Sequence, residues 1–150
     1  MKKARQKQGF RPTKNAVKSA LFSILGDISH KRFLDLFAGS GQIGREAILR
    51  GAYVTFVEKN RSIGAKLRQE FGKMVVITDA INFLKQGEVR WDIIFADPPY
   101  EFENYHILTK LAIESLNEGG IFVLEHSKKH TFECEKRKEY GDSVLSLWVR

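Results

Sequence analysis

The chain of 150 residues has room for one domain, and its composition, 43% hydrophobic and 29% charged, excludes a disordered chain. It has no apolar run near the ~20 residues that cross a bilayer, no apolar stretch of a secretory signal behind its basic start, and one cysteine, which excludes a disulfide framework. We therefore expect a single domain, residues 1–150, in the reducing cytoplasm, and the formal net charge of +7 favours an anionic partner.

The first predicted element is a basic arm over residues 1–12. Seven basic side chains precede Gly26 and no acid does, whereas the other 18 basic residues balance the 18 acids of the rest of the chain. Such a block is either a solvated tail or an anchor for phosphate groups. The candidate contacts to a nucleic-acid backbone are Lys2, Lys3, Arg5, Lys7, Arg11, Thr13 and Lys14.

Strands and helices then alternate along the chain. Arg11-Pro12-Thr13 predicts a helix start, with apolar residues at helical spacing up to residue 25. Strands are predicted at 33–37, 53–58, 74–78, 91–96 and 120–125, with helices after the first glycine-rich turn and at 60–71, 79–84 and 105–116. This order predicts an α/β fold with a parallel sheet covered on both faces. Two last strands, 132–140 and 144–149, would add an antiparallel hairpin.

The segment Phe37-Ala38-Gly39-Ser40-Gly41-Gln42-Ile43-Gly44 has the spacing GxGxxG between a predicted strand and a predicted helix. The glycines permit a sharp turn and a close approach to a ligand, and the helix start supplies free N–H groups. Arg45-Glu46 stand where a P-loop requires Lys and Ser or Thr, which excludes that motif. The alternative to a ligand site is a tight turn.

Three acids occupy the ends of the predicted strands. Asp35, two residues before the loop, could receive the ammonium of a methionine moiety and would repel a pyrophosphate. Glu58, followed by Lys59, is placed to hold ribose hydroxyls, and Asp79, followed by Ala80, to accept a hydrogen bond from an adenine amino group. These positions favour S-adenosylmethionine over a dinucleotide, although capping roles explain Asp35 and Asp79 as well.

Asp97-Pro98-Pro99-Tyr100 directly follows the predicted strand 91–96. Two prolines end the strand and fix a rigid turn, which holds the Asp97 carboxylate and the Pro98 carbonyl as neighbouring acceptors. Two acceptors suit an amino group with two N–H bonds, and the Tyr100 ring offers a face for stacking a base. We predict Asp97, Pro98 and Tyr100 as catalytic residues, with Asp97 also beside the cofactor.

Asp35 to Gly44, Glu58, Asp79 and Asp97 to Tyr100 together resemble the ordered motifs of class I S-adenosylmethionine-dependent methyltransferases that act on exocyclic amino groups of bases. The segments RPT, ALFSIL, FLDLFAGSGQIGREAILRGA and FVE further resemble the bacterial 16S ribosomal RNA guanine-N2 methyltransferases. The resemblance extends from about Arg11 to the final hairpin. The family usually carries a longer basic segment before RPT than residues 1–10 provide here.

The resemblance implies a Rossmann-like fold and transfer of a methyl group from S-adenosyl-L-methionine to N2 of a guanine. The implied partner is 16S ribosomal RNA or the small ribosomal subunit particle, and the protein is expected to act as a monomer. Asp97 and the Pro98 carbonyl would aim the nitrogen lone pair and stabilise the positive charge that develops on it. Alternatives are an adenine-N6 or cytosine-N4 methyltransferase, a non-catalytic RNA-binding protein, and an NAD-dependent oxidoreductase.

Neither a metal nor a membrane is predicted as a partner. His126, His130 and Cys134 recur at fourfold spacing, but the segment reads as strand or loop, so the three would not share a face. The basic residues of the same segment alternate with acids, which favours a solvated strand face for Lys128, Lys129, Lys136, Arg137 and Lys138.

Overall fold

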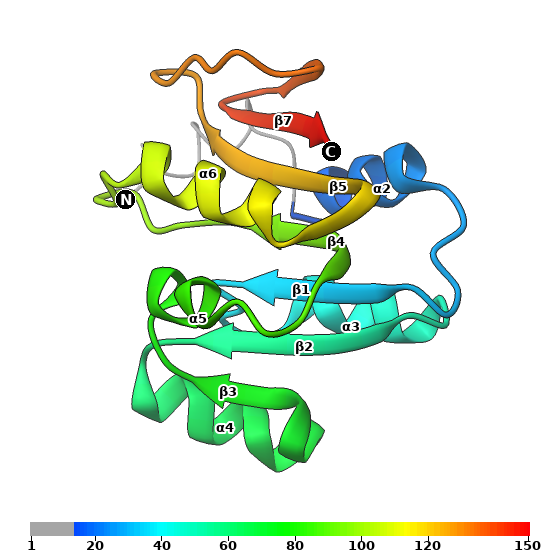
Figure 1. Ribbon diagram of the computed structural model, residues 1–150, viewed down its shortest axis with the longest axis vertical. Coiled ribbons are helices and arrows are strands. Elements are labelled where there is room, and N and C mark those ends of the chain that lie inside the picture. The colour runs from blue at the N-terminus through cyan, green and yellow to red at the C-terminus, as the bar shows by residue number, and fades with distance from the viewer. Residues whose placement is uncertain (1–13) are drawn as a thin grey trace, which may run out of the picture.

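The strand order defines the architecture (Figure 1). The computed structural model describes residues 14–150, which form a seven-stranded sheet in the order β3-β2-β1-β4-β5-β7-β6. Strands β1 to β5 run parallel, and β7 pairs antiparallel with both β5 and β6, so the last two strands form the predicted antiparallel hairpin at one edge. The strands are β1 (Arg32–Leu36), β2 (Tyr53–Glu58), β3 (Val75–Ile77), β4 (Trp91–Ala96), β5 (Leu116–Ser127), β6 (Lys136–Tyr140) and β7 (Ser143–Val149).

Helices cover both faces of the sheet. They are α2 (Lys14–Leu25), α3 (Gln42–Leu49), α4 (Arg61–Phe71), α5 (Ala80–Gln86) and α6 (Tyr105–Glu114), with a 3₁₀ turn at Gly72–Met74. Because side chains alternate along a strand, Phe33 of β1 packs in a core with α2, α3 and α4, whereas Leu34 packs in a second core with α5 and α6. Within residues 14–150, no helix is long and apolar enough to span a membrane.

The parallel register brings the carboxyl ends of the central strands to one edge. Asp35 of β1 pairs with Phe56 of β2 on one side and with Phe95 of β4 on the other. The chain proceeds from β1 to β2 and β3, then crosses back to β4, so β1 and β4 flank the point where the strand order reverses. Ligands of open α/β sheets bind at this kind of point.

Two predicted strands differ most from the structure, and the helix predicted at 105–116 ends at Glu114. β5 begins at Leu116 rather than at residue 120, because Leu116 pairs with Trp91 ahead of a register shift. The predicted strand from Phe132 forms only from Lys136 onward. The partly buried Phe132 ring lies in the loop before β6 and packs against Trp148, with ring centroids 6.0 Å apart.

The glycine-rich turn is a compact loop between β1 and α3. Phe37, Gly39 and Gly41 all have positive φ angles, of 59°, 57° and 82°. The Ala38 N–H donates to the Val57 carbonyl and the Gly41 N–H to the Ala38 carbonyl, both at 2.9 Å. A positive φ angle is energetically unfavourable for any residue other than glycine. Phe37 adopts one, so the backbone is strained within a predicted ligand site.

Gly44 is required because α3 lies directly on the Phe56 ring. A Cβ atom at position 44 would overlap that ring, and the ring is fully buried and stacked on Phe71 at 4.5 Å. Only a residue without a side chain lets the helix approach β2 this closely.

Gly44→Ala is expected to lower the free energy of unfolding by about 1–3 kcal/mol, because the buried ring must shift to admit the methyl group. Urea denaturation monitored by circular dichroism measures the loss. The control Ser62→Ala, on the exposed side of α4, should change stability by no more than about 0.5 kcal/mol. Equal stability of the Gly44 variant and the wild type would show that the helix can move away from β2.

Candidate active site

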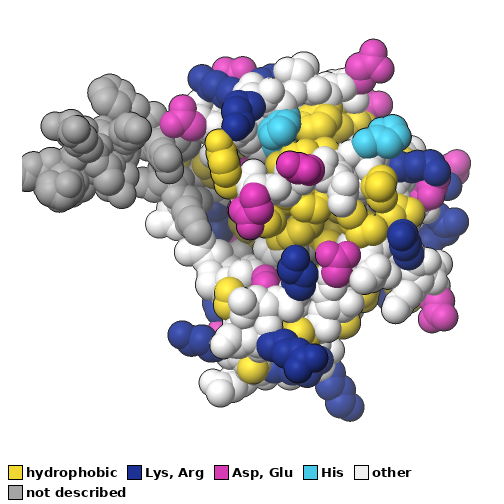
Figure 2. Space-filling model, turned by 90° about the vertical axis from the view of Figure 1, so that its left-hand side faces the viewer, with side chains coloured by type: hydrophobic (Ala, Val, Ile, Leu, Met, Phe, Trp, Pro, Cys, Tyr) yellow, Lys and Arg dark blue, Asp and Glu magenta, His cyan; other side chains and the backbone are white. Residues whose placement is uncertain are grey.

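Three adjoining pockets lie along the carboxyl edge of the sheet, and Asp97 lines all of them. The largest, of about 590 Å³, lies beside the Asp97–Tyr100 turn. A second, of about 130 Å³, follows the glycine loop, and a third, of about 250 Å³, lies over the ends of β2 and β3. Figure 2 shows this edge face on, with hydrophobic side chains gathered near its centre among acidic and histidine side chains.

The structure brings the predicted cofactor residues of β1, β2 and β3 together. The glycine-loop pocket is lined by Asp35, Phe37, Ala38, Gly39 and Ser40. The neighbouring pocket is lined by Phe37, Glu58, Lys59, Asp79 and Ala80. Gly41 and Gly44 line neither pocket and lie buried beneath the loop, where they allow its close packing on Leu67 and Phe56.

Asp35 is a carboxylate buried between β1 and the start of α3. It is 2% exposed, and one of its oxygens accepts a hydrogen bond from the Gly44 N–H at 3.0 Å. Burial raises the pKa of Asp35 well above its ordinary value; the Gly44 N–H opposes this, whereas the charges of Asp97 and Glu58 add to it. A cation placed in the adjoining pocket would therefore compensate a carboxylate that the protein itself leaves poorly neutralised.

Glu58 joins the glycine loop to the end of β2. Its Oε1 accepts a hydrogen bond from the Gly39 N–H at 2.8 Å, and its Oε2 accepts one from the Asn60 N–H at 3.0 Å. Each carboxylate oxygen can accept a second bond, so this side chain can position the loop and still meet hydroxyl groups in the pocket.

Asp79 caps helix α5. Its Oδ2 accepts a hydrogen bond from the Asn82 N–H at 3.0 Å, which is the capping role that sequence reasoning offered as an alternative. The same residue lines the pocket with Phe37. A cap fixes the orientation of the carboxylate, so both roles are compatible.

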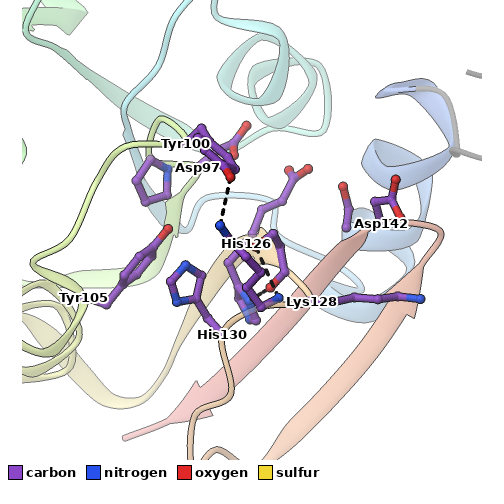
Figure 3. A pocket seen from close by; sticks show the side chains of 12 residues that line it. Asp97, Tyr100, Tyr105, His126, Lys128, His130 and Asp142 are labelled. Atoms are coloured by element: carbon purple, nitrogen blue, oxygen red, sulfur yellow. Dashed lines mark hydrogen bonds between the residues drawn. The ribbon is translucent and has the colours of Figure 1, made fainter. Parts of the chain in front are cut away.

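The Asp97–Tyr100 turn contributes residues to the largest pocket and to both smaller pockets, which lie on the side predicted to bind the cofactor and are called the cofactor-side pockets below. Pro98 is buried, and the Phe102 N–H donates to the Pro99 carbonyl at 3.0 Å, which closes the turn. Tyr100 is 78% exposed. Its hydroxyl accepts a hydrogen bond from Lys129 Nζ at 2.8 Å, a bond that lowers the Tyr100 pKa, and the ammonium lies 4.6 Å from the ring centroid (Figure 3).

Sequence reasoning missed the residues of α6 and β5 that line the largest pocket together with the Asp97–Tyr100 turn. The Tyr105 ring of α6 contacts the His130 ring in a tilted arrangement, with centroids 4.6 Å apart, and it contacts Phe102 edge to face at 5.1 Å. Phe102 in turn contacts Phe37 at 5.3 Å, so one aromatic row connects the two sides of the site. In Figure 3, Tyr105 lies on one side of the pocket and Asp142 on the other.

The end of β5 and the turn after it also line this pocket, through Glu125, His126, Ser127, Lys128 and Lys129. His126 is buried and bonded to Ser146 Oγ at 2.7 Å through Nε2 and to the Ser127 carbonyl at 2.8 Å through Nδ1. Burial lowers the His126 pKa, so the ring is neutral near pH 7. The run of polar residues at the end of β5 could have indicated a site in the sequence. Assigning these residues to the same site as Asp97 required knowing that β5 lies beside β4.

The remaining sequence predictions concern metal ligands and contacts to RNA. Among residues 14–150 no group of three or more His, Cys, Asp or Glu side chains is arranged to hold a metal ion. The predicted RNA contacts at Lys2, Lys3, Arg5, Lys7, Arg11 and Thr13 lie outside the described residues, and Lys14 is described only as the first residue of α2.

Residues 2–149 match a protein family described as Conserved hypothetical protein 95. The chain is 36% identical over 125 residues to Ribosomal RNA small subunit methyltransferase D of Haemophilus influenzae, in a match covering 75% of this chain and 63% of that protein. It is 36% identical over 152 residues to the protein of the same name in Buchnera aphidicola, covering 93% of this chain and 73% of the relative.

Solved structures share the architecture. A hypothetical protein of Thermus thermophilus matches with a TM-score of 0.81 and 30% identity, over 92% of this chain and 87% of its own. An RNA methyltransferase of Salinibacter ruber, solved with S-adenosyl-L-homocysteine, matches with a TM-score of 0.72 over 92% of each chain, at 15% identity. The likeness to the latter concerns the fold alone, and the predicted Rossmann-like class I methyltransferase fold is confirmed.

The buried Asp35 carboxyl predicts how stability depends on pH. Its pKa is raised on folding from an ordinary value of 3.8, so the folded state binds the proton more tightly and this contribution to stability is lost as pH rises above about 4. Wild type should therefore lose stability relative to Asp35→Asn with rising pH, by up to about 1.4 kcal/mol per pH unit. Urea unfolding of both proteins between pH 4.5 and 8 measures the difference.

Asp27 supplies a control of opposite sign. It is exposed, and the Ser29 N–H bonded to it lowers its pKa, so wild type should not lose stability relative to Asp27→Asn as pH rises. A difference between wild type and Asp35→Asn that stays constant with pH would show that Asp35 is ionised as readily in the folded chain as in the unfolded one.

Proposed function

The chain belongs to the Conserved hypothetical protein 95 family, and we propose that it transfers a methyl group from S-adenosyl-L-methionine to the N2 amino group of a guanine in 16S ribosomal RNA. The names of its relatives support the ribosomal RNA of the small subunit as substrate. The observation that carries the proposal is the position of Asp97, which lines both cofactor-side pockets and the largest pocket.

The residues present fit the proposed cofactor. The buried Asp35 carboxylate faces a pocket and lacks full neutralisation, which suits the ammonium of a methionine moiety. The Gly39 Cα faces open space, where a side chain would meet nothing within 4 Å, so the loop can approach a ligand closely. Glu58 would hold the ribose hydroxyls and Asp79 the adenine amino group. When bound, the cofactor supplies a methyl group activated by a sulfonium.

The largest pocket would hold the target nucleotide. Its volume of about 590 Å³ lies within the range of small-molecule sites, which is about 300–1,000 Å³. A base must leave its stack to reach Asp97, and the Tyr100 and Tyr105 rings can stabilise it in the pocket. Lys128 and Lys129 at the pocket wall would meet the phosphates beside that nucleotide.

Asp97 and Pro98 would act on the amino group itself. The lone pair of this nitrogen is delocalised into the guanine ring, which makes it a poor nucleophile. Hydrogen bonds to the Asp97 carboxylate and the Pro98 carbonyl would orient the amino group, and the carboxylate would stabilise the positive charge that appears on nitrogen in the transition state. The buried Pro98 keeps the two acceptors fixed, so little reorganisation is needed.

Labelled cofactor incubated with unmodified small-subunit RNA, naked and as particles, should yield labelled N2-methylguanosine on digestion to nucleosides and mass spectrometry. Asp97→Asn should lower this transfer by about a hundredfold or more, while the dissociation constant of S-adenosyl-L-homocysteine changes by less than about threefold. The control Glu101→Gln alters an exposed acid of the same loop and should retain wild-type turnover. Label on adenosine or cytidine would contradict the guanine assignment, and normal turnover of the Asp97 variant would contradict its catalytic role.

Glu58→Ala should weaken the binding of S-adenosyl-L-homocysteine by about 10- to 100-fold, because the variant loses both the proposed ribose contact and the bond that positions Gly39. Isothermal titration calorimetry measures the dissociation constant. Glu88→Ala, an exposed acid at the opposite edge of the sheet, serves as the control. An unchanged dissociation constant in the Glu58 variant would remove this residue from the cofactor site.

A further inference from the structure

Glu125 and Asp97 are neighbours at the ends of two adjacent parallel strands. Ala96, the last residue of β4, pairs with Leu124 of β5, so Asp97 directly after β4 and Glu125 of β5 each follow one residue beyond this pair. Side chains alternate along β5, and Val123 packs in the core on the α2–α3 face, so Glu125 projects to that face. Both carboxylates line the largest pocket and the glycine-loop pocket.

Tyr105 lies on the other side of Asp97. Tyr105 belongs to the core on the α5–α6 face and is 8% exposed. It also lines the largest pocket, and Figure 3 shows it near Asp97 and Tyr100. Burial raises the pKa of the Tyr105 phenol and the charge of Asp97 adds to this effect, so the hydroxyl keeps its proton and can donate. The pocket wall thus offers an acceptor, Glu125, on one side of Asp97 and a donor, Tyr105, on the other.

This arrangement matches one base in particular. In guanine the N2 amino group lies between N1–H, a donor, and N3, an acceptor. In adenine and in cytosine the ring nitrogen beside the amino group, N1 or N3, carries a lone pair and no proton. A carboxylate beside Asp97 would accept from N1–H of guanine and would repel the lone pair of the other two bases, since an ionised carboxylate can only accept.

We propose that Glu125 determines specificity for guanine, by accepting a hydrogen bond from N1–H while Asp97 holds the amino group. This assignment rests on the proposed methyl transfer to a guanine amino group. It adds a residue that no motif of the chain singles out, because Glu125 reaches the site only through the pairing of β4 with β5.

The test replaces the target guanosine, once its position is mapped by the transfer assay, with 2-aminopurine riboside in otherwise identical RNA. 2-Aminopurine keeps the N2 amino group but has a lone pair at N1 and lacks O6. Wild type should show a kcat/KM about 10- to 100-fold lower on this RNA than on the guanosine RNA. Glu125→Gln should reduce the preference to less than about threefold, because its amide N–H can donate to N1 of 2-aminopurine.

Glu133→Gln, which changes an exposed acid of the loop before β6, should keep the wild-type preference. The assignment is overturned if wild type methylates both RNAs equally or if Glu125→Gln keeps the full preference, which would point to recognition of O6. It is also overturned if Glu125→Gln loses cofactor binding without a change in preference. A wild-type protein that binds cofactor and methylates no guanine at all would overturn the proposed function itself, and this inference with it.

Discussion

The hydrogen bond between the buried Asp35 carboxylate and the Gly44 N–H is the interaction on which the site depends. This bond joins the end of β1 to the first turn of α3, and the glycine loop is the segment between the two bonded residues. Because the carboxylate is buried, its ionised form is costly unless donors or a cation face it. The bond therefore fixes the loop, and it holds the carboxyl group beside a pocket in which a cationic ligand would favour the ionised form.

The two halves of the site are built differently. On the proposed cofactor side, backbone hydrogen bonds fix the positions of Glu58, Asp79 and Gly39. On the substrate side, the largest pocket is open and its exposed Tyr100 and Lys129 contact one another. A half that is fixed by hydrogen bonds beside a more open half suits the proposed small-molecule cofactor on one side and the proposed nucleotide of an RNA chain on the other.

Much of the fold and of the candidate site could be predicted from the sequence, because the patterns that indicate them involve residues close together in the chain. The alternation of apolar strands and amphipathic helices predicts the layers, and the GxGxxG spacing and the two prolines after Asp97 mark loops that few other residues could form. The errors occur where tertiary contacts override local patterns. Phe132 was predicted in a strand, but it lies outside the sheet and packs on Trp148. β5 is longer than predicted because Leu116 pairs with Trp91.

By itself, the sequence determined the fold class, the glycine loop, and the candidate roles of Asp35, Glu58 and Asp97, because each depends on residues close together in the chain. Only the tertiary structure decided that Tyr105, Glu125 and His130 line one pocket together with Asp97. Strand order and register are set by the burial of whole faces against helices, and no short segment carries that information. For this reason the partners of Asp97 became visible only when β4, β5 and α6 were placed side by side.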